Sequence, residues 1–475
     1  MIKKEKPAVK IKFEFDLLNI KPLRKLILWK WFPYIFQFFI LIIFIVLIIL
    51  GWNIFTPTGI PDKLFAKSNL VTLIIWGIWW PLMIITAVFF GRLWCMVCPL
   101  ELVSNLSERI SKKIGVKQKS LPGWIQSGAI IVILYSLIQI LVPGIHLHRN
   151  PAFTSFFLAG LLSISVFIGV IYRDRAFCRG FCPIGILLNA YGRGSILAVR
   201  AKSKNICSDC NPKECIVSCK RYELDRRSCP SLLNPPKLNS NKDCLICGQC
   251  IKTCESENMQ LLIREPFSKS DYREKKTNWS LTIFIILASG FVTSELTTEW
   301  KYINEIFLLI PNYINDFIKI KNFIGFIDGL WILFLFPLLL WTILGLVAIT
   351  LKISKSVFDF WRSFALTAVI IISAGHIIKA VAKLNSWIGF LPQSLNDPNG
   401  INLAVGINNK SILSPGLLVG NYIVSFFGII ILSVFLFYSI SADFSNAENQ
   451  GFKSHIPKYI LYILFLLITA GIGFQ

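Results

Sequence analysis

Long apolar blocks separated by polar segments dominate this chain. Nine blocks predict membrane-spanning helices, because a helix needs about 20 consecutive apolar residues to cross the hydrocarbon core of a bilayer. These blocks cover residues 33–55, 69–90, 124–142, 153–172, 280–297, 329–351, 363–386, 416–440 and 459–474. The expected fold class is therefore an α-helical polytopic membrane protein with about nine spans.

The polar segments divide the chain into four parts. Residues 1–32 carry nine Lys or Arg and form the first segment, and residues 33–172 hold the first four predicted helices. The polar insertion 173–278 follows, and residues 279–475 hold the remaining helices. The insertion is long enough for a small domain of its own.

Composition supports the membrane assignment. Of the 475 residues, 54% are apolar and only 16% are charged, and such a chain has too few polar residues to cover a soluble fold. The net charge of +23 comes from Lys and Arg in the segments between spans, which favours topology over nucleic-acid binding as its cause. The loops 91–123 and 173–278 are basic and the loops 51–68, 143–152 and 389–415 are poorer in Lys and Arg. The bias predicts a multi-pass cytoplasmic-membrane protein with its N-terminus and insertion in the cytoplasm and its C-terminus outside.

The cysteines of the insertion carry the clearest chemistry. Their spacing is that of thiolates wrapping [4Fe–4S] cubes, and in two-cluster ferredoxins the fourth cysteine of each run binds the other cube. This rule assigns one cube to Cys207, Cys210, Cys215 and Cys254, and the other to Cys244, Cys247, Cys250 and Cys219. Zinc ribbons also use paired cysteines, but zinc has no use for the third and fourth cysteines of each run. Residues 205–265 are therefore expected to form a ferredoxin-like α+β domain with two cubes.

A second set of cysteines lies where two predicted helices end. Cys95 and Cys98 precede Pro99, and Cys178 and Cys182 precede Pro183, each time before an amphipathic stretch. This repeat predicts that the four thiols meet beside the ferredoxin-like segment. They could hold a third cluster or a copper ion, or act as redox thiols, since all three suit soft ligands; four buried structural cysteines are the alternative. Cys229 is then left as a spare or structural thiol.

These motifs, G-R-L-W-C-M-V-C-P, F-C-R-G-F-C-P-I-G and the tandem ferredoxin runs, resemble those of the NapH/NosR/CcoG-type membrane polyferredoxins over about residues 70–260. The resemblance implies electron exchange with membrane quinol in support of nitrate or nitrous oxide reduction, or copper handling in oxidase assembly. Several features depart from the pattern. The first Cys-Pro motif has two residues between its cysteines where three are usual. The first ferredoxin run has a four-residue gap between Cys210 and Cys215, and Lys220 stands where proline often follows the last ligand. The resemblance does not explain residues 279–475.

One histidine lies inside a predicted span. His376 is an ionisable group in an apolar helix, which makes it a candidate functional residue. It could bind haem b iron, accept a quinol proton, or simply form a hydrogen bond to a neighbouring helix. A bis-histidine haem would also need His146 or His148. Glu295 and Glu299 end the fifth span as proton-accepting or interfacial groups.

These observations predict a membrane-bound iron–sulfur protein that exchanges electrons between the quinone pool and a respiratory redox partner. The alternatives are a copper or other metal reductase or assembly factor, and a redox-sensing membrane subunit. The expected partners are the lipid bilayer, quinone or quinol and a redox protein, with no nucleic acid. We find no nucleotide loop, activated nucleophile or paired catalytic carboxylates.

Overall fold

The computed structural model describes residues 14–211, 213–223, 225–318, 324–442 and 451–474, apart from the side chains of Cys219 and Ile318. In this part of the chain, eight helices are long and apolar enough to cross a membrane. They are α2 (Tyr34–Gly51), α4–α5 (Leu70–Phe90, through the π-helical η2), α10 (Pro151–Ile171), α14 (Trp279–Thr297), α17–α18 (Ile324–Thr350, through η9), α19–α20 (Val357–Asn396), α22 (Asn421–Ser441) and η11–α23 (Gly451–Ile472).

These helices match eight of the nine predicted blocks. The remaining block, 124–142, becomes α9 (Ala129–Gly144), which has 16 residues and is shorter than the other spans. The structure thus confirms a mostly helical membrane protein, while the total of nine spans stays a prediction.

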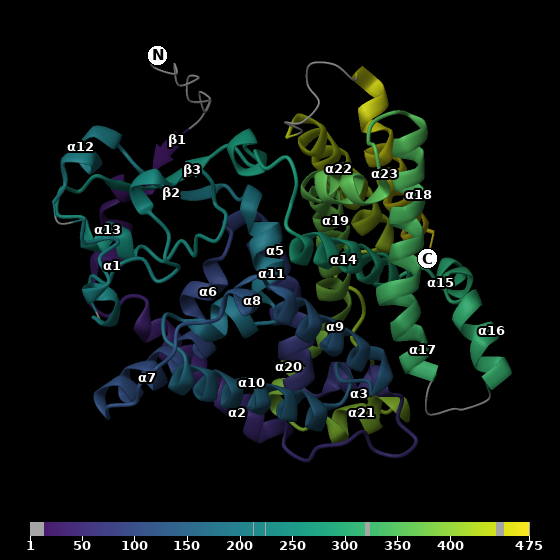
Figure 1. Ribbon diagram of the computed structural model, residues 1–475. Coiled ribbons are helices and arrows are strands. Elements are labelled where there is room, and N and C mark those ends of the chain that lie inside the picture. The colour runs from purple at the N-terminus through teal and green to yellow at the C-terminus, as the bar shows by residue number, and fades with distance from the viewer. Residues whose placement is uncertain (1–13, 212, 224, 319–323, 443–450, 475) are drawn as a thin grey trace.

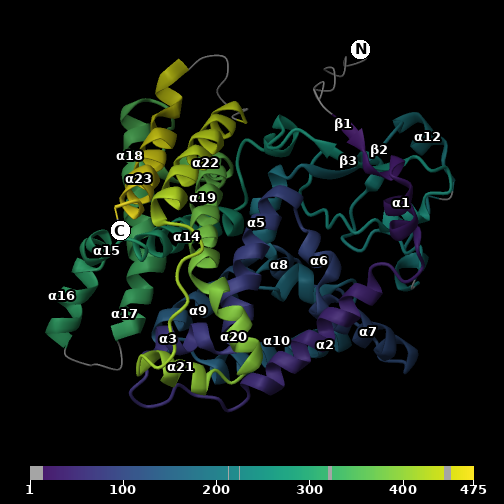
Figure 2. The same cartoon turned by 180° about the vertical axis from the view of Figure 1, so that it is seen from behind.

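Shorter helices connect the spans. They are α1 (Lys21–Leu28), α3 (Asp62–Ser68), α6 (Leu93–Val97), α7 (Pro99–Lys113), α8 (Gly123–Gln126), α11 (Gly185–Tyr191), α12 (Lys204–Asp209), α13 (Gln249–Thr253), α15 (Lys301–Phe307), α16 (Leu309–Ile318) and α21 (Ile401–Asn408). The small sheet with α12 and α13 lies beside one end of α5, and α3, α20 and α21 gather at the opposite end of the molecule (Figure 1, and from behind in Figure 2).

Helix α19 (Val357–Trp387) lies at the centre of the membrane part. It packs against α14, α22 and α5, and 94% of an 18-residue apolar stretch of its span is buried inside the protein. Ser356 caps its first turn, since the Ser356 hydroxyl accepts a hydrogen bond from the Asp359 amide. Because α5 belongs to the first half of the chain and α14 and α22 to the second, α19 joins the two halves into one helical core.

Helix α7 follows the first Cys-Pro motif and has an inverted amphipathic arrangement. Its polar residues Glu101, Ser104 and Glu108 are buried, whereas Leu106 and Ile110 are about half exposed. Apolar side chains on the outer surface of a membrane protein contact lipid rather than water. The predicted surface helix therefore turns its apolar face outward and its polar face toward the site described below.

The insertion builds a three-stranded antiparallel sheet in the order β1-β3-β2, from β1 (Glu14–Asp16), β2 (Leu197–Ala201) and β3 (Met259–Arg264). Along the sequence, β2 precedes and β3 follows the two ferredoxin-type cysteine runs. Strand β1 comes from residues 1–32, for which we predicted only a cytoplasmic N-terminal segment before the first span. Ile27 and Phe32 from that segment pack with Val199 and Ile251 of the insertion.

Lys252 fixes this N-terminal segment against the insertion. Its side chain is buried, and its ammonium group donates hydrogen bonds to the carbonyl oxygens of Trp29 at 2.6 Å and Phe32 at 2.8 Å. Asp225 lies 3.3 Å away and supplies the compensating negative charge. The N-terminal segment and the insertion, which are far apart in the sequence, thus form one domain.

The close crossing of α14 with η9 (Trp331–Leu335) gives a test of the packing. A Cβ atom added at Gly290 would lie 2.2 Å from the Ile332 carbonyl oxygen, whereas one at Gly160 in α10 would meet nothing within 4 Å. Gly290→Ala should destabilise the protein by about 1–3 kcal/mol through overpacking. Gly160→Ala should be neutral or stabilising by up to about 1 kcal/mol, because alanine favours helix. Thermal unfolding midpoints in detergent will show the difference, and equal midpoints would contradict this crossing.

Candidate iron–sulfur site

The four cysteines of the paired Cys-Pro motifs come together in the structure. Cys95 lies in α6, Cys98 starts α7, Cys178 lies in the π-helical turn η3 (Phe177–Phe181), and Cys182 directly follows that turn. Burial raises the pKa of Cys98, and the nearby thiols of Cys178, Cys182 and Cys95 raise it further. The pKa of Cys182 is raised to about 12 by burial and then by Cys178 and Cys95. Bare thiolates are therefore disfavoured here, and a thiolate state needs positive charge beside it.

Positive charge is supplied by arginines around these thiols. Arg175 donates a hydrogen bond from Nη2 to the Cys178 sulfur at 3.5 Å, and Arg92 lies against Cys95. Both arginine side chains are at least nine-tenths buried. Buried arginines beside sulfur ligands stabilise the thiolate form and hold its geometry.

Glu101 neutralises part of this charge. Its Oε1 lies 3.0 Å from Arg175 Nε and 3.0 Å from Arg227 Nη2, and its Oε2 accepts a hydrogen bond from Gln37 at 2.7 Å. Burial by itself would raise the pKa of Glu101, but the charges of Arg175 and Arg227 and the hydrogen bonds of Arg227 and Gln37 outweigh it and lower the pKa to about 2. One buried carboxylate thus links α2, α7, the loop before η3 and the insertion.

The second thiol set lies at the end of the insertion that is remote from the membrane helices. A cavity of about 160 Å³ is lined by Cys207, Cys210, Cys215 and Cys254, the four residues predicted for one cube. Burial raises the pKa of Cys215 to about 11, with further contributions from the other three thiols. The Asn258 side chain donates a hydrogen bond to the Cys207 sulfur at 3.1 Å, and the Asn258 backbone N–H donates one to the Cys254 sulfur at 3.3 Å.

The third thiol set contains a residue that we had assigned as spare. Burial raises the pKa of Cys250, and the neighbours that raise it further begin with Cys247, Cys229 and Cys244. Cys229 therefore joins Cys244, Cys247 and Cys250 in this group. The side chain of Cys219, the predicted fourth ligand, lies outside the described side chains. A sequence signal did exist, because Cys229 precedes Pro230, as the last cysteine of a ferredoxin run often does.

The loop that carries the third set has unusual backbone angles. Asp243 and Ile246 have φ values of 59° and 56°, and Gly248 has 70°, all in the left-handed region. Only glycine adopts such angles without cost, so the other two residues mark local strain that the surrounding contacts must maintain. The loop thereby wraps its cysteines closely, as the Cys-x2-Cys-x2-Cys spacing predicted.

The three thiol sets fit iron–sulfur clusters in their donor chemistry. Each contains four cysteines in reach of one another, and thiolate sulfur is the ligand that these clusters require. Within the described residues, no three His, Cys, Asp or Glu side chains converge as they would on a single metal ion. A cube binds each thiolate through a different iron, so its ligands need not converge on one point.

The sets follow one another in space. Arg175 interacts electrostatically with Cys178 and Cys95 of the Cys-Pro set and with Cys247 of the third set. Cys250 of the third set in turn neighbours Cys215 of the second. The order from the membrane edge outward is therefore the Cys-Pro set, the Cys244–Cys250 set and the Cys207–Cys254 set.

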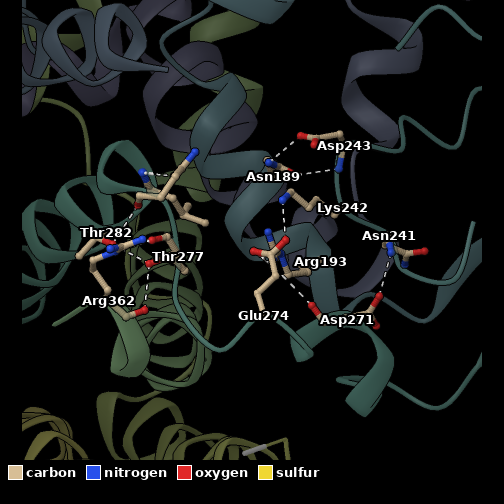
Figure 3. A network of polar contacts seen from close by, with 12 residues as sticks. Asn189, Arg193, Asn241, Lys242, Asp243, Asp271, Glu274, Thr277, Thr282 and Arg362 are labelled. Carbon is tan, nitrogen blue, oxygen red and sulfur yellow. Dashed lines mark hydrogen bonds and ion pairs between the residues drawn. The ribbon is translucent and has the colours of Figure 1, made fainter. Parts of the chain in front are cut away.

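A cleft of about 310 Å³, lined by both polar and apolar side chains, reaches Cys178 from the junction of the insertion with the membrane helices. On its wall, Glu274 bonds Lys242 at 2.5 Å and lies 3.4 Å from Arg193, and Asn189 donates to Asp243 at 2.9 Å (Figure 3). These contacts connect α11 and η4 (Gly192–Gly194) with later parts of the insertion at Lys242, Asp243 and Glu274. Cys178 is the member of the Cys-Pro set that lines this cleft.

Of the three roles predicted for His376, the structure shows the hydrogen bond to a neighbouring helix. Its Nδ1 lies 3.1 Å from the Tyr191 hydroxyl, and the rings of Trp80 and Phe291 surround it. Both ring nitrogens of His148 are hydrogen-bonded, one to the Val142 carbonyl oxygen and one to Arg149. A haem between His376 and His148 or His146 stays a prediction that these contacts do not support.

Comparisons with known proteins point to the same region. Residues 72–117 and 153–205 match a family model described as a 4Fe-4S binding domain, and these residues include all four Cys-Pro cysteines. The ferredoxin-type protein NapH of Escherichia coli is 24% identical over 182 residues, which are 36% of this chain and 62% of that protein. NapH of Haemophilus influenzae is 25% identical over 178 residues, 35% of this chain and 61% of that protein.

An uncharacterized protein of Methanocaldococcus jannaschii is 24% identical over 219 residues, 42% of this chain and 82% of its own length. The chain spans less than two thirds of the NapH relatives. No solved structure matches the chain. The comparisons confirm the predicted resemblance to iron–sulfur proteins of the NapH type.

Replacing Glu101 will test the buried charge network. Glu101→Gln leaves Arg175 and Arg227 without their carboxylate, and breaking a buried pair in this way costs about 3–5 kcal/mol. The matched control is Glu257→Gln, which breaks the exposed ion pair with Arg24 and should cost less than about 1 kcal/mol. Thermal unfolding in detergent will compare the two variants, and equal losses would mean that Glu101 does not hold the arginines.

Proposed function

We propose that this chain, which is similar to ferredoxin-type NapH proteins, exchanges electrons between the quinone pool and a respiratory redox partner. The observation that carries this proposal is the ordered line of three four-cysteine sets, from the membrane edge to the outer end of the insertion. An iron–sulfur cluster in each set would accept and donate single electrons. A line of such stations suits electron transfer better than catalysis on a soluble substrate.

The ligand assignment follows the thiol sets. Cys207, Cys210, Cys215 and Cys254 hold one cube, as the spacing predicted. Cys244, Cys247 and Cys250 hold the second, and we propose Cys229, a thiol neighbour of Cys250, as its fourth ligand in place of the predicted Cys219. A third [4Fe–4S] cluster at Cys95, Cys98, Cys178 and Cys182 is supported by the 4Fe-4S family model, which matches both Cys-Pro motifs.

The two ends of the line suit different partners. The cleft beside Cys178 lies where α9 and α14 begin, and its wall combines apolar Ile131 and Leu281 with polar Asn189 and Asp243. A quinol head group enters such an amphipathic cleft from the bilayer and reaches the Cys-Pro set. The outer end belongs to an insertion with 20 Lys and Arg against 11 Asp and Glu over residues 173–278. This surplus favours an acidic redox protein as the partner.

The same surplus supports a cytoplasmic location for the insertion. Lys and Arg are concentrated on the cytoplasmic side of membrane proteins, and the loops 91–123 and 173–278 are the basic ones. A reducing compartment also keeps the cysteines available as metal ligands. We therefore place the three thiol sets at the cytoplasmic face of the cytoplasmic membrane.

Serine substitutions will decide the fourth ligand of the second cube. Cys229→Ser should lose or alter the EPR signal of one cluster in anaerobically purified protein, because serine oxygen is a poorer iron ligand than thiolate. Cys219→Ser is the matched control and should keep all signals and the wild-type iron and sulfide contents. The opposite result would restore Cys219 as the ligand.

Quinol reduction will test the function itself. In proteoliposomes, a reduced quinone analogue should reduce the clusters of the wild-type protein, as followed by absorbance and EPR. Cys178→Ser should slow this reduction at least tenfold, while dithionite should still reduce the two cubes of the insertion. Clusters that dithionite reduces but quinol does not would contradict the quinol proposal, and copper in place of iron at the Cys-Pro set would favour an assembly factor.

A further inference from the structure

Helix α19 carries a row of ionisable side chains inside the membrane part. Lys379 and Lys383 follow His376 by three and seven residues, so the three side chains share one face of the helix. His376 is 3% exposed and Lys379 is 8% exposed. Ionisable residues are costly at such positions, and in membrane proteins they commonly mark ion or proton paths.

The end of α14 supplies the opposite charges. Lys379 Nζ lies 2.6 Å from Glu299 Oε1 and 3.5 Å from Glu295 Oε2, and it donates to the Thr298 hydroxyl at 2.8 Å. Glu295 also interacts electrostatically with His376 and with Lys383. The groups therefore form one connected set of donors and acceptors rather than isolated pairs.

The set reaches from one end of the membrane part toward the other. Helix α14 begins directly after the insertion at Trp279 and ends at Thr297, so Glu295 and Glu299 lie at the end remote from the insertion. Its 19 residues span about 28 Å at 1.5 Å per residue, close to the thickness of the hydrocarbon core. At the near end, Tyr191 ends α11, the helix that follows Cys182 and Pro183.

We propose that Glu299, Lys379, Glu295, His376 and Tyr191 form a proton-transfer path that couples reduction of the Cys-Pro set to proton uptake through the C-terminal helices. Charge arriving at a buried redox site is costly in a medium of low dielectric constant, and a proton moving toward it compensates that charge. Each transfer breaks one N–H or O–H bond at the donor and forms one at the acceptor. The proton taken up at Glu299 ends on the His376 imidazole, which becomes imidazolium while Tyr191 keeps its hydroxyl proton. One proton therefore moves and no residue of the path is oxidised.

The surroundings of His376 suit a proton carrier. The titratable groups facing it are Tyr191 from α11, Glu295 from α14, and Lys379 and Lys383 from α19 itself. From α5 its neighbour is the Trp80 ring, and from α14 also the Phe291 ring. The imidazole therefore contacts the Tyr191 hydroxyl and lies within the electrostatic reach of Glu295 and Lys379.

This path rests on the proposed electron transfer, and the experiment separates the two. Purified protein in weakly buffered detergent is reduced with a stoichiometric reduced viologen while a pH indicator records proton uptake. The wild-type protein should take up protons as its clusters are reduced. His376→Gln, which keeps a hydrogen-bonding side chain but cannot carry the proton, should take up at least threefold fewer.

The matched control is Ser373→Ala in the same helix, which removes a buried hydroxyl that donates to the Ile370 carbonyl oxygen. It should retain wild-type uptake. Tyr191→Phe gives a second variant of the path should His376→Gln fail to fold. Iron and sulfide contents and EPR signals must equal those of the wild type in each variant compared.

The outcomes are distinct. Reduced clusters with equal proton uptake in wild type and His376→Gln, or with no uptake in wild type, would overturn the path and leave the proposed function intact. Absence of acid-labile sulfide from the wild-type protein would overturn the proposed function first. A midpoint potential that falls with pH in wild type and in Ser373→Ala, but not in His376→Gln, would support the path independently.

Discussion

The structure depends on how buried charge is balanced at the membrane edge. Four thiols, three arginines and Glu101 meet there with little access to water. An unpaired charge in such a place costs several kcal/mol, so each group constrains the position of the others. This requirement explains why α7 turns its polar face inward, and why Gln37 of the first span bonds a carboxylate from a later helix.

The same balance orders the parts of the chain around the thiols. Arg227 comes from the insertion, Arg175 from the loop before η3 and Glu101 from α7, so their contacts bring the insertion onto the membrane helices. Lys252 connects the N-terminal segment to this assembly through two carbonyl oxygens and Asp225. The sheet is completed by β1 from that segment. The cysteine runs are therefore held from the membrane side and from the N-terminal side.

The C-terminal helices extend this arrangement rather than form a separate domain. Helix α19 contacts α5 of the first half and α14 and α22 of the second, and its His376 reaches Tyr191 just beyond the second Cys-Pro motif. A buried set of acids and bases thus begins near the proposed electron-transfer site and ends at the remote end of α14. The part of the chain that the family resemblance leaves unexplained supplies most of the ionisable groups of this set.

The sequence by itself determined the features that depend on neighbours along the chain. Helical spans follow from long apolar blocks, and the pairing of Cys207, Cys210, Cys215 and Cys254 around one cavity agrees with their spacing. Only the tertiary structure decided which residues from distant segments meet: Cys229 with Cys244, Cys247 and Cys250, and Glu101 with Arg175 and Arg227. It also decided that Tyr191 meets His376, 185 positions away. Local spacing is set by backbone geometry, whereas these contacts are set by packing and charge balance among segments whose separation in the sequence carries no periodic signal.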